Sequence, residues 1–264
     1  MEGAGVRLKR VFSNAEVLLF DPFLLLDHFG SDDPEDYVKG FPWHPHRGIE
    51  TVTYMLTGEV EHGDSMGNGG TINSGDVQWM TAGSGIIHQE MPKKYEGLMQ
   101  GFQLWVNLPA KKKMMKPRYR GITKEHIASF EKEGANVKVI AGRIDDTEGP
   151  VRDLVVNVEY FDVELEAGEK FEHPTHKGWT VFAYVIDGSA YSGETAIKPE
   201  NCALFGDGDI VRIRTTKGAH FLFVTGKPLN EPIAWRGPIV MNTEAELALA
   251  FRELEEGTFI KATT

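Results

Sequence analysis

Short runs of alternating apolar and polar residues extend along most of this chain, and glycine or proline separates one run from the next. Runs rich in β-branched and aromatic residues occupy Thr51–Leu56, Gly101–Val106, Leu154–Tyr160 and Thr180–Ile186. Runs of this length, bounded by turn residues, are typical of strands in an all-β sandwich or barrel. The pattern therefore predicts an all-β protein with few helices.

Two segments carry helix signals instead. Thr243-Glu-Ala-Glu246 is a capping box, and apolar residues follow it at helical spacing from Leu247 to Leu254. A shorter candidate begins at Thr123–His126 and ends before Gly134. We expect one short helix after Thr243 and at most one more before Gly134.

The two halves of the sequence contain similar markers in the same order. The pairs, separated by 130 to 133 residues, are His46 and His176, Gly58 and Gly188, Asp76 and Asp209, and His88 and His220. A nearly constant offset indicates a duplicated domain. We place the boundary at the polar stretch that begins with Lys132, which predicts domains at 1–131 and 132–264, the second including the C-terminal helix.

Composition places the chain among ordinary globular proteins, with 41% hydrophobic and 25% charged residues in 264. No apolar run approaches the roughly 18 residues of a membrane span, and we see no secretory signal. Cys202 is the single cysteine, which rules out an intrachain disulfide and fits a reducing compartment. The net charge of −11 argues against direct nucleic-acid binding. We expect a cytoplasmic protein, and we interpret the basic run Lys111–Lys116 as a solvated loop, with a patch for an acidic partner as the alternative.

Histidine and glutamate residues recur at a spacing of two in the first half. His44 and His46 form one pair, and His88 and Glu90 form another about forty residues later. Because residues i and i+2 of a strand share a face, each pair can aim at one point. Three imidazoles and a carboxylate would make a site for a divalent transition metal. Glu50 is also an even number of residues from His44 and His46, so in a regular strand it would share their face. It is therefore a second candidate for the carboxylate.

The second half departs from this spacing. His173 and His176 are three residues apart, which places them on opposite faces of a strand. Leu222, not a carboxylate, stands two residues after His220. We expect no metal in this half.

The order of these motifs resembles that of cupins, and several longer blocks resemble one cupin family, the pirins. The blocks are Asp21–Gly30, His44–Val52, Gln78–Gly83, Gly85–Pro92, Leu104–Lys111 and Gly237–Thr243. The resemblance implies two tandem cupin β-barrels, of which only the first holds a metal. Carried over by position, the ligands are His44, His46, His88 and Glu90, and the metal is Fe(II), with Mn, Co, Ni, Cu or Zn as alternatives.

Some pirins resemble quercetinase in activity, so the resemblance implies a dioxygenase that cleaves a flavonol-like aromatic enol with O2 and releases carbon monoxide. Glu90 is then also the candidate general base. An alternative is an iron-dependent regulatory protein, a transcriptional cofactor or enzyme modulator, which has a protein partner and no turnover. A sugar-phosphate isomerase is less consistent with the sequence, because Arg47 is the single basic residue near the motif, and we interpret it as a surface or salt-bridge residue.

Overall fold

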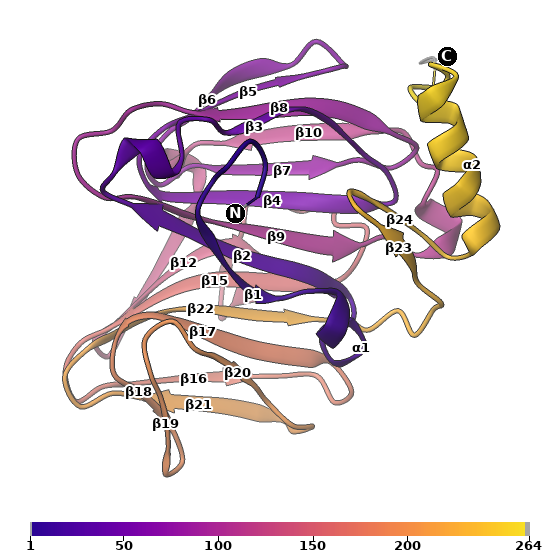
Figure 1. Ribbon diagram of the computed structural model, residues 1–264. Helices are drawn as coiled ribbons and strands as arrows, with labels where there is room; N and C mark the ends of the chain where they lie inside the picture. The colour runs from indigo at the N-terminus through magenta and orange to yellow at the C-terminus, as the bar shows by residue number, and fades with distance from the viewer. Residues whose placement is uncertain (1, 262–264) are drawn as a thin grey trace. The chain divides into compact units, whose positions relative to one another are not determined.

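A computed structural model describes residues 2–261, which form two compact units (Figure 1). The first unit comprises 2–18, 23–124 and 229–261, and the second comprises 19–22 and 125–228. The first unit therefore includes a segment that follows the second unit in sequence. The predicted domains at 1–131 and 132–264 were placed from the sequence repeat, and this boundary stays a prediction.

The first unit contains a six-stranded sheet, a four-stranded sheet, a two-stranded hairpin and several helices. Its six-stranded sheet has the order β1-β2-β9-β4-β7-β10, and its four-stranded sheet has the order β3-β8-β5-β6. The strands are β1 (Leu8–Phe12), β2 (Phe23–Ser31), β3 (Phe41–His46), β4 (Ile49–Thr57), β5 (Val60–Asp64), β6 (Gly69–Ile72), β7 (Val77–Thr81), β8 (Ile86–Pro92), β9 (Met99–Asn107) and β10 (Arg118–Ile122). The α-helices are α1 (Val17–Phe20) and α2 (Glu244–Glu255), and short 3₁₀ helices occupy Asn14–Glu16, Pro34–Asp36, Ala110–Lys112 and Lys124–His126. The hairpin β23 (Ala234–Arg236) and β24 (Ile239–Met241) precedes α2.

The second unit repeats this architecture. Its six-stranded sheet has the order β11-β12-β15-β22-β17-β20, and its four-stranded sheet has the order β16-β21-β18-β19. The strands are β11 (Ala128–Lys132), β12 (Ala135–Ala141), β13 (Arg143–Ile144), β14 (Thr147–Glu148), β15 (Val158–Leu165), β16 (Lys170–Pro174), β17 (Thr180–Gly188), β18 (Ala190–Ser192), β19 (Thr195–Ile197), β20 (Cys202–Leu204), β21 (Ile210–Arg214) and β22 (Ala219–Gly226). Two cupin-like domains and a short C-terminal helix are therefore confirmed.

The matching sheet orders also show which markers of the repeat are equivalent. In the four-stranded sheets β3 and β8 correspond to β16 and β21. In the six-stranded sheets the run β2-β9-β4-β7 corresponds to β15-β22-β17-β20, so β9 corresponds to β22. His88 lies on β8, whereas His220 lies on β22, so the sequence pairing of these two histidines is wrong. Val211, which pairs with His173 as His88 pairs with His44, occupies the place of His88. The pairing of Asp76 with Asp209 is wrong for the same reason, because these residues precede β7 and β21.

Most predicted elements are present, and two differ for physical reasons. The segment predicted as a strand from Leu154 begins its ladder only at Val158, which pairs with Gly226. The helix predicted after Thr123 is a single 3₁₀ turn, followed by β11. This strand forms a hairpin with β12 through Glu133 and Gly134, both at positive φ (48° and 72°). Sheet pairing thus overrides the helix propensity of a polar segment.

Helix α2 begins at the predicted capping box. The Thr243 side chain accepts a hydrogen bond from the Glu246 backbone N–H, and the Glu246 side chain accepts from the Thr243 backbone N–H. Its buried residues Leu247 and Ala250 pack with residues of β24 and with Phe259 in the first unit. Among residues 2–261 there is no helix long and apolar enough to cross a membrane.

Candidate metal centre

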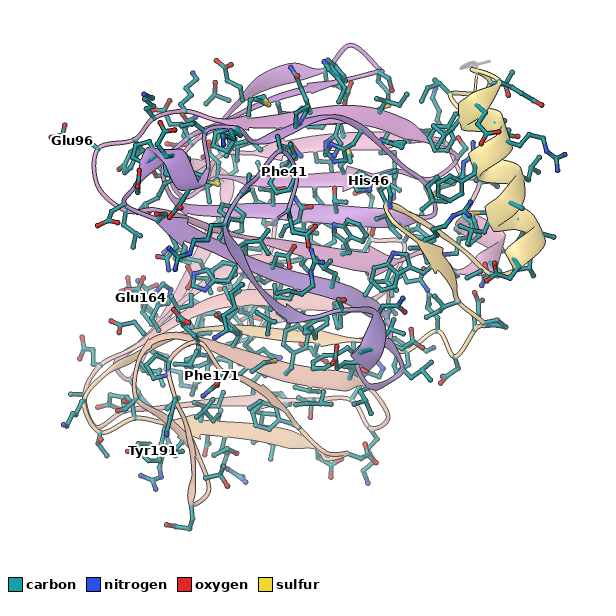
Figure 2. All side chains as sticks on the ribbon, in the orientation of Figure 1. Phe41, His46, Glu96, Glu164, Phe171 and Tyr191 are labelled. Atoms are coloured by element: carbon teal, nitrogen blue, oxygen red, sulfur yellow. The ribbon has the colours of Figure 1, made fainter. Side chains whose placement is uncertain are left out.

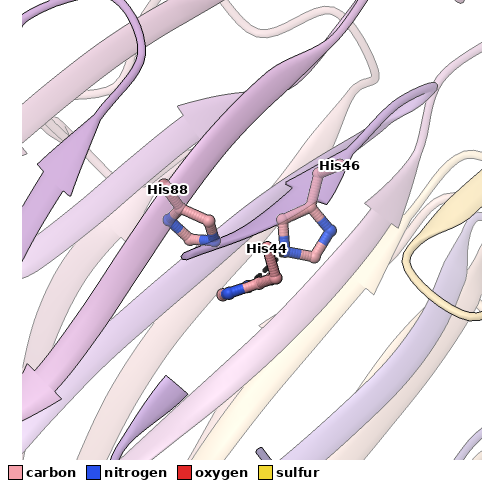
Figure 3. A group of neighbouring side chains, drawn as sticks. All are labelled: His44, His46 and His88. Atoms are coloured by element: carbon pink, nitrogen blue, oxygen red, sulfur yellow. Dashed lines mark hydrogen bonds between the residues drawn. The ribbon is translucent and has the colours of Figure 1, made fainter. Parts of the chain in front are cut away.

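Three histidine side chains of the first unit converge between β3 and β8 (Figure 3). His44 and His88 are direct partners in the β3–β8 ladder, and His46 lies two residues along β3 on the same face. One ligand atom from each imidazole lies within 4.8 Å of the other two. His46 and His88 are 1% and 0% exposed, whereas His44 is half-buried and faces a cavity.

Backbone carbonyl groups fix the orientation of two of these rings. Nδ1 of His44 lies 2.9 Å from the Pro42 oxygen, and Nδ1 of His46 lies 3.2 Å from the Pro238 oxygen. A carbonyl oxygen can only accept, so each Nδ1 carries the proton and donates. In its neutral form each ring therefore presents a lone pair at Nε2, as in metal sites where the other ring nitrogen is held by an outer partner. His46 lies beside the β23–β24 hairpin that contributes Pro238 (Figure 2).

The donor set fits a metal ion. Nε2 of His44 and Nε2 of His46 are 3.1 Å apart, and two lone pairs at this distance repel unless a cation lies between them. Two nitrogens at about 2.1 Å from one metal and at right angles to each other would be about 3.0 Å apart. Buried His88 has no hydrogen-bond partner for either ring nitrogen among the described residues, an arrangement that costs free energy unless a ligand completes it.

Burial keeps two of the imidazoles neutral. Removal from water lowers the pKa of His46 and His88 well below the usual 6.5, and the neighbouring imidazoles lower both further. A neutral imidazole is the form that binds a metal. These two imidazoles therefore stay available to a cation at a pH where exposed histidines are already protonated.

We expect the metal-free protein to lose stability as the pH falls below about 6.5. The unfolded chain then binds protons at His46 and His88 that the folded chain cannot bind, so acid favours unfolding until the folded pKa values are reached. Urea unfolding of chelator-treated protein between about pH 5 and pH 7.5 measures this slope. A His88→Ala variant should show a shallower slope, and an identical slope in that variant would contradict the assignment.

Glu90 lies near the imidazoles but is held by other side chains. Its Oε1 accepts from the Thr53 hydroxyl at 2.8 Å and from Gln78 at 3.5 Å, and its Oε2 accepts from Nε2 of Gln103 at 3.0 Å. The cluster of converging ligand atoms comprises the three histidines without Glu90. The structure thus places the carboxylate behind the site, in contact with donors that would have to yield for it to reach a metal.

Glu50, the alternative carboxylate, faces the other side of its sheet. Its Oε1 accepts from Thr81 at 2.5 Å and lies 3.8 Å from Arg118, and burial raises its pKa. Thr53, three residues along β4, reaches Glu90, so alternation directs Glu50 away from the imidazoles. Gly48, at φ +78°, interrupts the regular alternation of faces between His44 and Glu50. Even spacing therefore does not place the two side chains on the same face.

A cavity of about 650 Å³ opens beside the site. His44, His46 and Gln103 border it, together with Phe29, Phe41, Trp105 and Trp235 and with the Arg10–Asp27 ion pair. A smaller cavity of about 20 Å³ borders Glu90 and shares Phe29, Phe41 and Gln103 with the larger one. The larger volume suits a drug-sized aromatic molecule, and the smaller one suits a single water.

Several residues at the site carried no sequence motif. His62 is buried beside His88, 5.6 Å between ring centroids, and stacks on Tyr119 at 4.7 Å. Burial, reinforced by Asp64 and Glu90, raises the pKa of Tyr119 to about 12. Lys113 from the basic run is also buried, and its Nζ donates to the Gly48 carbonyl at 3.0 Å. His62 on β5, His88 on β8 and Tyr119 on β10 meet because strands distant in sequence fold together.

The histidines of the second unit do not converge. His173 is buried among Phe161, Phe171 and Phe223, and its Nε2 lies 2.9 Å from Glu159. His176 is exposed beyond the end of β16.

Comparisons with known proteins identify the family to which this architecture belongs. The family model for pirin matches residues 5–106, and the model for the pirin C-terminal cupin domain matches residues 160–260. A pirin-like protein of Caulobacter vibrioides is 44% identical over 260 residues, which cover 98% of this chain and 94% of that protein. A Pseudomonas aeruginosa protein, provisionally named a quercetin 2,3-dioxygenase, is 46% identical over 264 residues, covering 97% and 93%. A crystal structure of quercetin 2,3-dioxygenase from Acinetobacter baumannii superposes with a TM-score of 0.90 at 36% identity, covering 97% of this chain and 93% of that one.

Proposed function

The chain belongs to the pirin family of two-domain cupins, and from this premise we propose that it is a metal-dependent dioxygenase of the quercetin 2,3-dioxygenase type. One observation carries the proposal: three converging imidazoles, two of them bordering a large cavity lined by aromatic side chains. The name of the Acinetobacter baumannii structure supports the same reaction class. The substrate is a flat aromatic enol of flavonol type, which reacts with O2 and releases carbon monoxide.

Fe(II) is the proposed metal, held by His44, His46 and His88, with Glu90 as the fourth ligand. Nitrogen-rich ligation suits Fe(II) and also Mn, Co, Ni, Cu or Zn, so metal supply contributes to the choice. When bound, the metal would supply a positive charge for an anionic substrate oxygen and redox chemistry toward O2. The carbonyl groups of Pro42 and Pro238 keep Nε2 of two ligands free of protons for this role.

The protein itself positions the substrate and receives its proton. Trp105 and Trp235, 6.0 Å apart between ring centroids, offer apolar faces to a planar ring in the cavity. Gln103 stands between this cavity and Glu90, because its Oε1 accepts from Nε1 of Trp105 at 3.0 Å while its Nε2 donates to Glu90. A substrate hydroxyl at the cavity wall can pass its proton to Glu90 through one water in the small cavity. Glu90 is therefore proposed both as ligand and as general base.

Purified protein reloaded with Fe(II) is expected to consume quercetin under air, with loss of its visible absorbance and release of carbon monoxide. Chelator-treated protein without added metal should show at least about 100-fold less turnover, because the reaction class depends on the metal. Parallel samples with Mn, Co, Ni, Cu and Zn determine the metal preference.

An absence of turnover with every one of these metals, in protein that still binds metal at His44, His46 and His88, would contradict the dioxygenase. It would favour the second candidate, an iron-dependent binding protein that uses the same ligands and acts through a protein partner. Loss of metal binding itself would contradict both candidates.

A further inference from the structure

The Arg47 side chain, next in sequence to His46, is buried in the first unit and connects β3 to a segment about 200 residues away. Its guanidinium donates from Nε to the Ser84 carbonyl at 2.7 Å and from Nη2 to the Phe259 carbonyl at 2.9 Å. Its Nη1 lies 2.7 Å from Glu253 on α2, and the guanidinium carbon lies 4.1 Å from the Phe259 ring centroid. Arg47 is 1% exposed. The planar guanidinium thus meets three acceptors on two chain segments. Such a contact fixes the relative position of the segments as well as stabilising them.

The backbone reinforces the same connection. The Val240 N–H donates to the Arg47 carbonyl at 3.1 Å, and Arg47 and Ile239 form a parallel β-bridge. One residue before that bridge, Pro238 accepts the hydrogen bond from Nδ1 of His46. The segment therefore contacts the metal strand at the ligand itself and at the residue that follows it.

Gly48 shows how closely this segment packs. A Cβ added at Gly48 would lie 1.9 Å from the Val240 carbonyl oxygen, so the backbones meet without room for a side chain. Trp235 and Pro238 of the same segment also border the large cavity. One segment thus holds a ligand and forms part of the cavity wall.

We propose that residues 234–259, here called the C-terminal brace, set the affinity of the metal centre, with Arg47 as the positioning residue that fastens the brace to β3. This inference rests on the proposed metal site. Arg47 neither borders the large cavity nor belongs to the converging imidazoles, so it acts through His46. Removal of the Arg47 side chain frees the brace. Pro238 then no longer holds Nε2 of His46 toward the other two imidazoles.

Titration of chelator-treated full-length protein with Co(II), followed by its visible absorption bands, tests the proposal. Arg47→Met is expected to weaken Co(II) binding about 10- to 100-fold, the range found when an outer partner of a metal ligand is removed. Arg236→Met is the matched control, since the Arg236 guanidinium carbon also lies over an aromatic ring of the brace, 3.7 Å from the Phe251 ring centroid. Within residues 2–261 the Arg236 side chain bonds to neither Arg47 nor His46. This control should change the affinity less than threefold.

The outcomes separate the two proposals. Unchanged Co(II) affinity in Arg47→Met would overturn the brace while leaving the metal site intact. Equal losses in Arg47→Met and Arg236→Met would also overturn it, because general loosening of the segment would then explain both. Failure of the unmodified protein to bind Co(II) would instead overturn the metal site.

Hydrogen exchange provides a test that needs no variant. Coupling between two sites is reciprocal, so a brace that strengthens metal binding must itself be stabilised by the metal. Co(II) is expected to slow exchange of the Val240 amide about 10-fold or more, while amides in the second unit, such as those of β17, keep their rates. Equal rates for Val240 with and without Co(II) would overturn the proposal even if Arg47→Met failed to fold.

Discussion

Replacing His88 by alanine is expected to weaken metal binding strongly while leaving the fold intact. His88 offers the most buried of the three imidazoles, with no hydrogen-bond partner for either ring nitrogen among the described residues. The substitution removes one ligand and leaves no buried hydrogen-bond partner unpaired. It should therefore lower the metal affinity without lowering the stability of the metal-free protein. We expect an affinity at least about 100-fold lower, beyond the range for outer partners of a ligand.

Unfolding midpoints give the measurement for this variant. Metal at 100 times its dissociation constant stabilises a protein by about 2.7 kcal/mol, which raises the midpoint by about 5 to 10 °C for domains of this size. His88→Ala should lose this shift. His28→Gln is the matched control, because His28 is also buried in the first unit but stacks on Phe102 and pairs with Gln100. A metal-induced shift that survives in His88→Ala would exclude His88 as a ligand.

Replacing Glu90 by glutamine is expected to lower turnover by about 100- to 10,000-fold, the range for loss of a general base. The amide keeps the shape of the carboxylate and can still accept from Thr53, so the fold and the cavity should persist. Glutamine has no ionised oxygen to receive the substrate proton. Steady-state rates with quercetin, measured together with metal content, separate the two proposed roles of Glu90.

Metal content decides between these roles. A Glu90→Gln variant with full metal and low turnover supports the general base, and one that also loses metal supports the ligand. Full metal with full turnover would exclude the general base. Glu50→Gln is the matched control, because Glu50 is also buried but accepts a hydrogen bond from Thr81 on the opposite face of the sheet. We expect that variant to keep its turnover within about 10-fold, below the range for a catalytic base.

Period-two spacing predicted that His44 and His46 share a face, whereas their meeting with His88 was implied by the family resemblance. His44 and His46 share a face of β3, and the ladder places His88 opposite His44. The same rule gave Glu50 as an alternative, and it failed there because Gly48 interrupts the strand at positive φ. The position of Glu90 behind Gln103 depends on hydrogen bonds between side chains from β4, β7 and β9, and no sequence spacing encodes these.

The repeat shows where sequence comparison reaches its limit. Sheet orders confirm the duplication, yet a constant offset matched His88 with His220 on a non-equivalent strand. Loops of different length between equivalent strands can compensate for one another, so an offset can stay constant while the alignment shifts by one strand. Pro238 could not be predicted at all, because it contributes a backbone carbonyl, which any residue would have.

The order of synthesis determines when the contact between His46 and Pro238 can form. Pro238 follows His46 by 192 positions, and residues 125–228 of the second unit are translated between them. At roughly 5 to 20 residues per second, a ribosome needs roughly 10 to 40 s to cover that distance. During this period a nascent first barrel lacks the carbonyl that orients His46. The proposed metal would therefore reach its final geometry only after both barrels have been translated.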